Sequence, residues 1–228
     1  MNNSKLEKTY PKKIVLTFDD AVKNHYTFVA PILKKYHFGA TFFPCAFSED
    51  WRKKNQDFSL SKDELTALYK LGFEIGNHTW NHPGMSKFSD EENLKEIELL
   101  NEYLSRLNIP KPTSFAYPGG PYVPNVVPLL ISQEINCART TELRPWIPSI
   151  DDNYRIPAIP ISKNDKEGFY NAVKLCNKDN YVVLVFHGIP DIVHPWVTNS
   201  EEIFLEFMEY LYNNDYQVVS LKTALTQQ

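Results

Sequence analysis

Residues 14–20 read Ile-Val-Leu-Thr-Phe-Asp-Asp, an apolar run that ends in two adjacent carboxylates. The β-branched and aromatic side chains of this run predict a buried strand, and the two acids mark its carboxyl end. Short apolar runs of the same kind recur along the chain and are separated by longer amphipathic stretches. They cover residues 40–43, 73–76, 114–117, 137–139, 181–186 and 217–219. Such alternation is typical of a parallel α/β fold.

The stretches between the predicted strands carry helix signals. Ser61-Lys62-Asp63-Glu64 and Ser89-Asp90-Glu91-Glu92 are capping boxes, so a helix is expected to begin after each serine. Gly72 and Pro110 mark the expected ends of these two helices. Further helices are expected over residues 26–35, 125–132, 167–176 and 203–212.

One segment lacks these signals. Residues 140–163 contain four prolines and little periodicity, which predicts a loop with a short strand at 155–158. The whole chain then holds about seven βα units, with no linker and no internal repeat. This arrangement favours a single-domain barrel, of irregular shape, over an open sheet.

The size and charge of the chain limit the classes of function. Its 228 residues, 43% of them hydrophobic and 23% charged, suit one globular domain. The net charge of −4 and the lack of a Lys/Arg cluster argue against nucleic acid as a partner. No apolar stretch of about 18 residues is present, so no membrane span is expected. Cys45, Cys137 and Cys176 form no metal-binding pattern, and we interpret each as a small buried apolar residue.

The first residues, Met1 to Lys8, contain no apolar signal region. The protein is therefore expected either to be cytoplasmic or to be secreted with its signal absent from this sequence. The sequence pattern favours no particular oligomeric state.

Metal-capable side chains follow several of the predicted strands. The pair Asp19-Asp20 ends the first strand, and His78 and His82 follow the third. The Tyr-Pro-Gly-Gly turn of residues 117–120 follows the fourth, and His187 follows the most apolar strand. In parallel barrels the carboxyl ends of the strands form the rim on which active sites are built.

The residue types at this rim point to metal chemistry. His78 and His82 are four residues apart, so in a helical turn both imidazoles would project from one face and could share an ion. A carboxylate from Asp19-Asp20 completes a two-histidine, one-carboxylate set, which suits a hydrolytic zinc-like ion or a non-heme iron oxygenase. The other carboxylate could serve as a general base and His187 as a general acid. A base and an acid beside an ion favour a hydrolase.

Four segments of the chain resemble the successive motifs of the polysaccharide deacetylase family, also called carbohydrate esterase family four or the NodB homology domain. They are Thr17-Phe18-Asp19-Asp20, His78-Thr79-Trp80-Asn81-His82-Pro83, Phe115-Ala116-Tyr117-Pro118-Gly119-Gly120 and Val185-Phe186-His187. Their order and spacing match the family from about Lys13 to Leu221. The resemblance implies an α/β fold, a distorted (β/α)₇ barrel, with residues 13–228 as the catalytic domain after an extension of residues 1–12.

The resemblance also implies a role for each site residue. Asp20, His78 and His82 would ligate a divalent metal, with zinc expected and cobalt or nickel as alternatives. Asp19 would be the base that takes a proton from a metal-bound water, and His187 would protonate the leaving amine. The backbone N–H of Gly119 would help to bind the oxyanion. Contacts with substrate are expected from Tyr117, Pro118, Trp80 and Trp196.

The chain departs from the family pattern at the third motif. Ala116 stands where the family usually has an arginine that orients and charges the base, and Gly119 where it usually has a tyrosine. A cation should therefore reach Asp19 from elsewhere on the rim. Arg139 is the candidate because it ends the strand at 137–139, and Arg155 is the second choice. The alternative is that Arg139 only pairs with a surface acid such as Glu142.

The resemblance also implies a fourth motif, an Asp-and-Trp element behind the acid, which would fall in a region that contains Arg139, Trp146, Asp151 and Asp152. His25 and His37 flank the first predicted helix and are interpreted as surface or packing residues.

The leading hypothesis is a metal-dependent hydrolase that removes N-acetyl groups from a glycan or peptidoglycan-like oligosaccharide. An O-acetyl xylan esterase and a cyclic amide hydrolase remain alternatives that would use the same site. An inactive barrel that binds carbohydrate is a third, supported only by the missing arginine at Ala116.

Overall fold

The structure is a computed structural model that describes residues 12–227. The predicted extension, residues 1–12, lies outside the described residues apart from Lys12, which begins the first strand. The proposed boundary of the catalytic domain stays a prediction.

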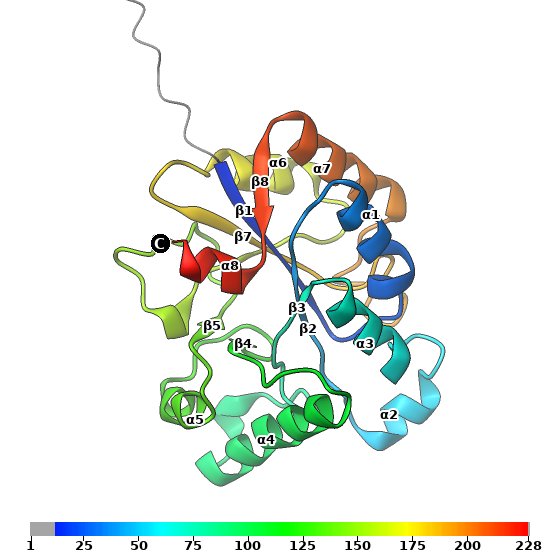
Figure 1. The fold of residues 1–228 in the computed structure, drawn as a ribbon, viewed down its shortest axis with the longest axis vertical. Coiled ribbons are helices and arrows are strands. Elements are labelled where there is room, and N and C mark those ends of the chain that lie inside the picture. Colours follow the sequence, from blue (N-terminus) through cyan, green and yellow to red (C-terminus); the bar gives the residue numbers. More distant parts are fainter. Residues whose placement is uncertain (1–11, 228) are drawn as a thin grey trace, which may run out of the picture.

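The strands cross the centre of the molecule and the helices lie around them (Figure 1). Every pairing between named strands is parallel. The strands are β1 (Lys12–Asp19), β2 (Thr41–Phe43), β3 (Glu74–Ile75), β4 (Ser114–Ala116), β5 (Cys137–Arg139), β6 (Ile159–Pro160), β7 (Tyr181–Phe186) and β8 (Tyr216–Val219).

The strands close into an irregular ring. One sheet has the order β3-β2-β1-β7-β6, with β8 beside the first half of β1, and β4 and β5 form a separate pair. Two isolated parallel bridges join the two sheets, one between Asn77 and Phe115 and one between Arg139 and Ile156. The predicted distorted barrel is therefore confirmed.

The helices follow most of the predicted starts. Both capping boxes are formed, with the Ser61 and Ser89 side chains accepting from the backbone N–H groups of Glu64 and Glu92. The α-helices are α1 (Ala30–Lys35), α2 (Glu49–Lys54), α3 (Lys62–Lys70), α4 (Asp90–Arg106), α5 (Val127–Ser132), α6 (Lys166–Lys174), α7 (Glu201–Asn213) and α8 (Leu221–Thr226). Short turns of helix complete them, a π-helical turn at His25–Val29 and 3₁₀ turns at Met85–Lys87, Pro124–Val126 and Asn153–Arg155.

The structure differs from the prediction at three places. The helices α2 and α8, each of six residues, were not expected because they are too short to show a clear period. The strand expected at 155–158 lies instead at Ile159–Pro160. Asp152 caps a 3₁₀ turn there, since its side chain accepts from the N–H of Tyr154 at 2.8 Å.

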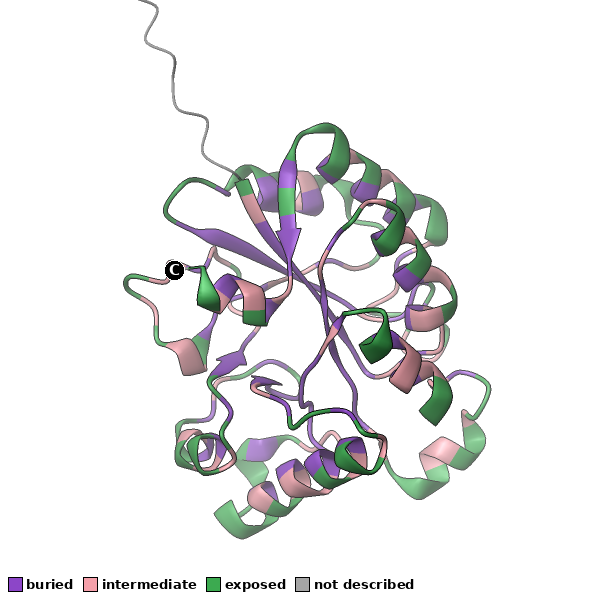
Figure 2. Ribbon diagram, viewed as in Figure 1, coloured by how far each residue is buried: buried purple, intermediate pink, exposed green. Residues whose placement is uncertain are grey.

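Side chains of β1 alternate between two apolar clusters. Ile14, Leu16 and Phe18 pack in the larger cluster, with residues of α1, α3, α6 and α7. Val15 packs in a second cluster with residues of β2, β4, β5 and β7, which is the interior of the barrel. Burial follows the same plan, because the strands are buried and the outer faces of the helices are exposed (Figure 2). Asp19 is four residues from Val15, so it ends the row that faces the interior.

Glu74 ties the amino ends of several strands together. Its carboxylate accepts from the hydroxyls of Thr41 and Ser114, both at 2.7 Å, and from the backbone N–H of Lys222 in α8 at 2.8 Å. Leu221 of α8 packs in the interior cluster and donates its N–H to Thr41 Oγ1 at 2.9 Å. Helix α8 thus closes the end of the barrel opposite to Asp19. No helix within residues 12–227 combines the length and the apolar character needed to cross a membrane.

Replacing Glu74 by alanine should destabilise the fold. Three donors would lose their acceptor, which we expect to lower the free energy of unfolding by about 2 kcal/mol. Glu102→Ala is the matched control, because the exposed Glu102 pairs only with Arg106 one helical turn away. Urea unfolding followed by circular dichroism measures both, and equal stability of the two variants would contradict the assigned role of Glu74.

Candidate active site

A pocket of about 430 Å³ opens at the carboxyl end of the barrel. The interior-facing rows of three strands continue into it, through Asp19 at the end of β1, Arg139 at the end of β5 and His187 directly after β7. Eight of the residues predicted for the site line this pocket: Asp19, Asp20, His78, His82, Gly119, Arg139, His187 and Trp196.

Three of these residues form a cluster that could hold a metal ion. Ligand atoms of Asp20, His78 and His82 all lie within 4.8 Å of one another. Asp20 Oδ1 is 3.7 Å from His78 Nε2 and 3.6 Å from His82 Nε2. Zinc binds imidazole nitrogen and carboxylate oxygen at about 2.0–2.2 Å, so donors around one ion lie roughly 3–4 Å apart. The donor set therefore fits a divalent ion.

The tautomer of His78 suits a metal ligand. Its Nδ1 lies 2.7 Å from the carbonyl oxygen of Ala116, so Nδ1 carries the proton and donates it there. Burial lowers the pKa of His78 to about 4, and the ring is neutral at ordinary pH. The lone pair of Nε2 consequently faces Asp20 and is free to bind an ion.

The segment from His78 to His82 is not the helical turn that would place both imidazoles on one face. Thr79 and His82 have φ values of +65° and +56°, which break any helix. Hydrogen bonds hold the turn instead, from the Thr79 N–H to Asn77 Oδ1 at 2.8 Å and from the His82 N–H to Thr79 Oγ1 at 3.1 Å. The two rings still meet, with centroids 4.8 Å apart.

Asp19 and Arg139 form a buried ion pair across the barrel interior. One guanidinium nitrogen, Nη2, donates to Asp19 Oδ1 at 2.5 Å and to Oδ2 at 2.6 Å. Arg139 is 1% exposed and its guanidinium lies over the ring of Phe43, with Cζ 5.4 Å from the ring centroid. This is the position expected from the sequence, although the contact uses one nitrogen and not a two-nitrogen fork.

The electrostatics of the pair keep Asp19 ionised. Burial alone would raise its pKa, but the charge of Arg139, followed by His78 and His187, lowers the pKa to about 2.

The two alternatives considered from the sequence are wrong, namely a surface pair between Arg139 and Glu142 and Arg155 as the cation beside Asp19. Glu142 pairs with Arg155, at 2.6 Å between Nε and Oε1, and Arg155 does not line the pocket.

A buried histidine lies behind His187. His187 Nε2 is 3.8 Å from Asp20 Oδ2, on the side of the carboxylate away from His82. His25 is fully buried and its Nε2 lies 3.2 Å from the backbone oxygen of His187. Burial lowers the pKa of His25 to about 4, so its neutral ring donates this hydrogen bond. His25 therefore has the packing role expected from the sequence. It also contacts the backbone of His187, which the sequence did not predict.

Some pocket residues carry no signal that sequence reasoning could use. Phe47 follows β2, whose end carries no charged residue, and Thr141 lies in the proline-rich loop. Only the tertiary structure brings these two side chains to the rim. His194, in contrast, follows the strand of His187 in the sequence and lines the pocket as that position suggests. It is held by the buried Asp191, with Nδ1 and Oδ1 3.4 Å apart, and its ring stacks on Trp51 at 6.0 Å between centroids.

Three of the residues predicted to contact substrate do not line this pocket. Tyr117 is 1% exposed and donates its hydroxyl to the carbonyl oxygen of Tyr154 at 3.1 Å. Pro118 is buried beside it. Trp80 turns away and packs against Tyr103, with ring centroids 5.3 Å apart. In contrast, Trp196 is 60% exposed at the rim.

Two of the residues considered for the fourth motif, Trp146 and Asp151, lie outside the pocket that contains His187. Trp146 is fully buried in the barrel interior, where its backbone pairs with Tyr181. Asp151 accepts from both terminal nitrogens of Arg144, at 2.8 and 2.9 Å. Neither residue lines the pocket with His187.

Comparison with known proteins gives the family of the chain. The family model for polysaccharide deacetylase matches residues 7–137. Peptidoglycan-N-acetylmuramic acid deacetylase PdaC of Bacillus subtilis (strain 168) is 32% identical over 113 residues, 48% of this chain and 22% of PdaC. Poly-beta-1,6-N-acetyl-D-glucosamine N-deacetylase of Staphylococcus epidermidis is 30% identical over 166 residues, 68% of this chain and 57% of that protein. The chain thus spans between about a fifth and three fifths of the length of these relatives.

Solved structures share the fold. PdaC from Bacillus subtilis has a TM-score of 0.63 at 22% identity, over 93% of this chain and 89% of that chain. BA3943, described as a carbohydrate esterase family four pseudoenzyme from Bacillus anthracis, has a TM-score of 0.64 at 21% identity, over 93% of this chain and 65% of that chain. The fold and the motif-bearing pocket define a carbohydrate esterase type of barrel. The chain belongs to the polysaccharide deacetylase family.

The three clustered residues should bind one divalent ion. We expect zinc to bind with 1:1 stoichiometry in calorimetry, and His78→Ala and His82→Ala each to abolish micromolar binding, because each removes a ligand. His37→Asn is the control, since it removes an exposed imidazole outside the pocket and asparagine tolerates the φ of +57° found there. Unchanged zinc binding in the two alanine variants would place the ion elsewhere.

Proposed function

We propose that the protein is a metal-dependent hydrolase that removes N-acetyl groups from a glycan or peptidoglycan-like oligosaccharide. One observation carries this proposal: an ionised, arginine-paired Asp19 lies beside the three-residue donor cluster in one open pocket. Family membership supports hydrolysis of an acetyl group. The names of the two curated relatives, which specify N-acetylated glycans, support an amide over an ester.

Asp20, His78 and His82 would hold the ion. Zinc is proposed, because two neutral imidazoles and one carboxylate with an open pocket in front are typical of its hydrolytic sites. When bound, the ion would supply a Lewis acid that polarises the acetyl carbonyl and lowers the pKa of a water molecule.

Asp19 would act as the general base. Its carboxylate is 3.8 Å from His78 Nε2, so it borders the donor cluster without being part of it. Arg139 acts here as a positioning residue. Its two contacts to the carboxylate oxygens fix the rotamer of Asp19 and keep it charged in a buried place.

His187 and Gly119 would act on the leaving amine and on the carbonyl oxygen of the acetyl group. His187 lies across Asp20 from His82 and would protonate the leaving amine. Gly119 lines the same pocket with a φ of +70°, a conformation in which glycine exposes its backbone without strain. Its N–H would donate to the developing oxyanion. Trp196, exposed at the rim, would stack on a sugar ring.

Asp19→Asn and His187→Ala test the acid–base assignment. We expect Asp19→Asn to lower kcat by about 10²-fold or more while zinc binding persists, as for loss of a general base. His187→Ala should lower kcat less on substrates with good leaving groups. Acetate release from chito-oligosaccharide, acetylated xylan and a cyclic imide should be measured with the zinc-loaded protein, with His37→Asn as control.

The three substrates separate the alternatives. Preference for xylan or for the imide would replace the proposed substrate, and no release from any acetylated compound would favour the inactive carbohydrate-binding barrel. Loss of zinc in Asp19→Asn and its retention in Asp20→Asn would exchange the roles of the two acids.

Arg139→Gln should change the pH dependence of the reaction. Without the guanidinium, which is the strongest influence that lowers it, the pKa of the buried Asp19 rises. The base is then protonated at mildly acid pH, so kcat/KM should fall most on the acid side, and the acid limb should move to higher pH. Arg139→Lys keeps a charge and should shift the limb less. An unchanged pH profile in Arg139→Gln, with zinc still bound, would exclude the positioning role.

A further inference from the structure

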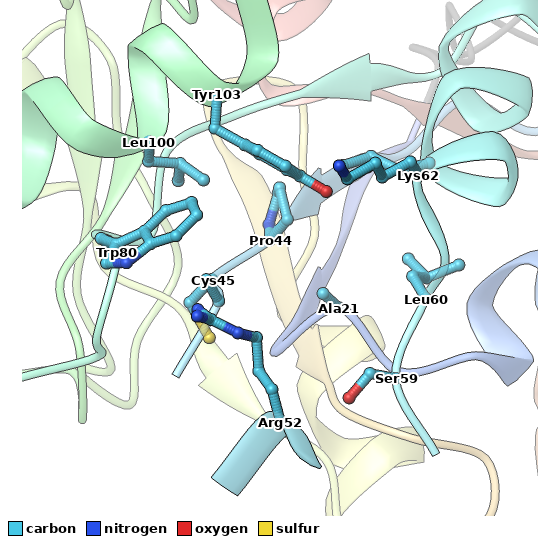
Figure 3. Close-up of a pocket in the computed structure, with 12 residues that line it drawn as sticks. Ala21, Pro44, Cys45, Arg52, Ser59, Leu60, Lys62, Trp80, Leu100 and Tyr103 are labelled. Carbon is cyan, nitrogen blue, oxygen red and sulfur yellow. The ribbon is translucent and has the colours of Figure 1, made fainter. Parts of the chain in front are cut away.

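A second pocket lies beside the active site and shares no lining residue with it. Its volume is about 350 Å³, within the range of small-molecule sites of about 300–1,000 Å³. The walls come from the end of β2, from α2, α3 and α4, and from the loop between β3 and α4 (Figure 3). Apolar and aromatic side chains form most of its lining, among them Leu60, Leu65, Trp80, Leu100 and Tyr103.

Two cations border this apolar pocket. Arg52 and Lys62 both line it, and no carboxylate does. Among residues 12–227, neither cation has an ion pair, whereas the neighbouring Lys53 pairs with Glu49 at 2.7 Å. Arg52 donates one hydrogen bond, to the carbonyl oxygen of Phe47 at 3.0 Å, and its guanidinium lies over Trp80 at 5.2 Å. The positive charge at the pocket is therefore not neutralised by the protein.

The phenol of Tyr103 adds a polar group at the same rim. Its hydroxyl is directed toward Lys62 from the opposite wall (Figure 3). Burial raises the pKa of Tyr103, so this hydroxyl remains a donor at ordinary pH. A pocket with an apolar floor and several donors at its rim suits a molecule with an apolar body and an anionic end.

We propose that this pocket binds a small amphipathic carboxylate, with its aryl or aliphatic body between Trp80, Leu65 and Leu100 and its carboxylate between Arg52 and Lys62. A neutral sugar would use the aromatic side chains but leave the two cations without a counter-charge. The pocket also adjoins the metal cluster, because the lining residue Cys45 directs its thiol to Asp20 Oδ1 at 3.6 Å.

The test uses 4-phenylbutyrate, its neutral amide and inorganic phosphate as probes of the zinc-loaded protein in isothermal titration calorimetry. We expect the acid to bind at least tenfold more tightly than the amide or phosphate, because only the acid matches both the apolar floor and the cations. Equal affinity for acid and amide would overturn the proposal, as would binding of phosphate as tightly as the acid.

A charge-matched pair of variants locates the bound acid. Arg52→Gln/Lys62→Gln should weaken 4-phenylbutyrate binding about tenfold or more. Lys53→Gln/Lys54→Gln removes the same number of charges from the same part of the surface and should leave the affinity within twofold. Lys62→Gln alone, at an exposed side chain, should give a smaller loss. Binding that is unchanged in the first double variant would place the carboxylate elsewhere, the zinc ion included, and overturn the proposal.

Discussion

A carboxylate and a guanidinium meet inside the barrel, and the site is arranged around their contact. Asp19 and Arg139 come from strands far apart in the sequence, yet each is nearly sequestered from water. A buried charge without a partner is strongly destabilising, so each of the two residues requires the other. The pair also holds β5 at a fixed distance from β1 across the interior. The donor cluster of Asp20, His78 and His82 then borders a carboxylate that has one position and one charge state.

The alternation of side chains along the strands explains why much of this site could be predicted from the sequence. A strand that is buried on both faces still directs every second residue inward, so the polar residue that ends an inward row reaches the rim. Asp19 and His187 follow this rule, and so does Arg139, although it stands in for an arginine expected at Ala116. Space limits the residue that follows β3 to glycine, because a Cβ at Gly76 would lie 2.2 Å from the ring of Phe43.

In the loops beyond the strands the alternation no longer places the side chains, and Trp80 and Tyr117 do not line the pocket. Trp80 and Tyr117 lie in loops whose direction depends on positive φ angles and on hydrogen bonds to distant residues, neither of which a periodic pattern reveals. A periodic pattern also does not reveal the contact of His25 with the backbone of His187, which joins residues far apart in the chain. Short elements such as α2 also gave no signal, although α2 supplies a wall of the second pocket.

Among residues 12–227, the β-bridges between the larger sheet and the β4–β5 pair are isolated ones. On one side Asn77 exchanges two backbone hydrogen bonds with β4, and on the other Ile156 exchanges two with the β5 segment. Few backbone ladder bonds therefore cross the two seams between these sheets, and the contact of Asp19 with Arg139 crosses the interior beside them. Because β4–β5 carries Arg139 and leads to Gly119, opening of these seams would have to separate two buried charges, which is strongly destabilising. The ion pair therefore resists opening of the barrel at the place where its backbone ladder is thinnest.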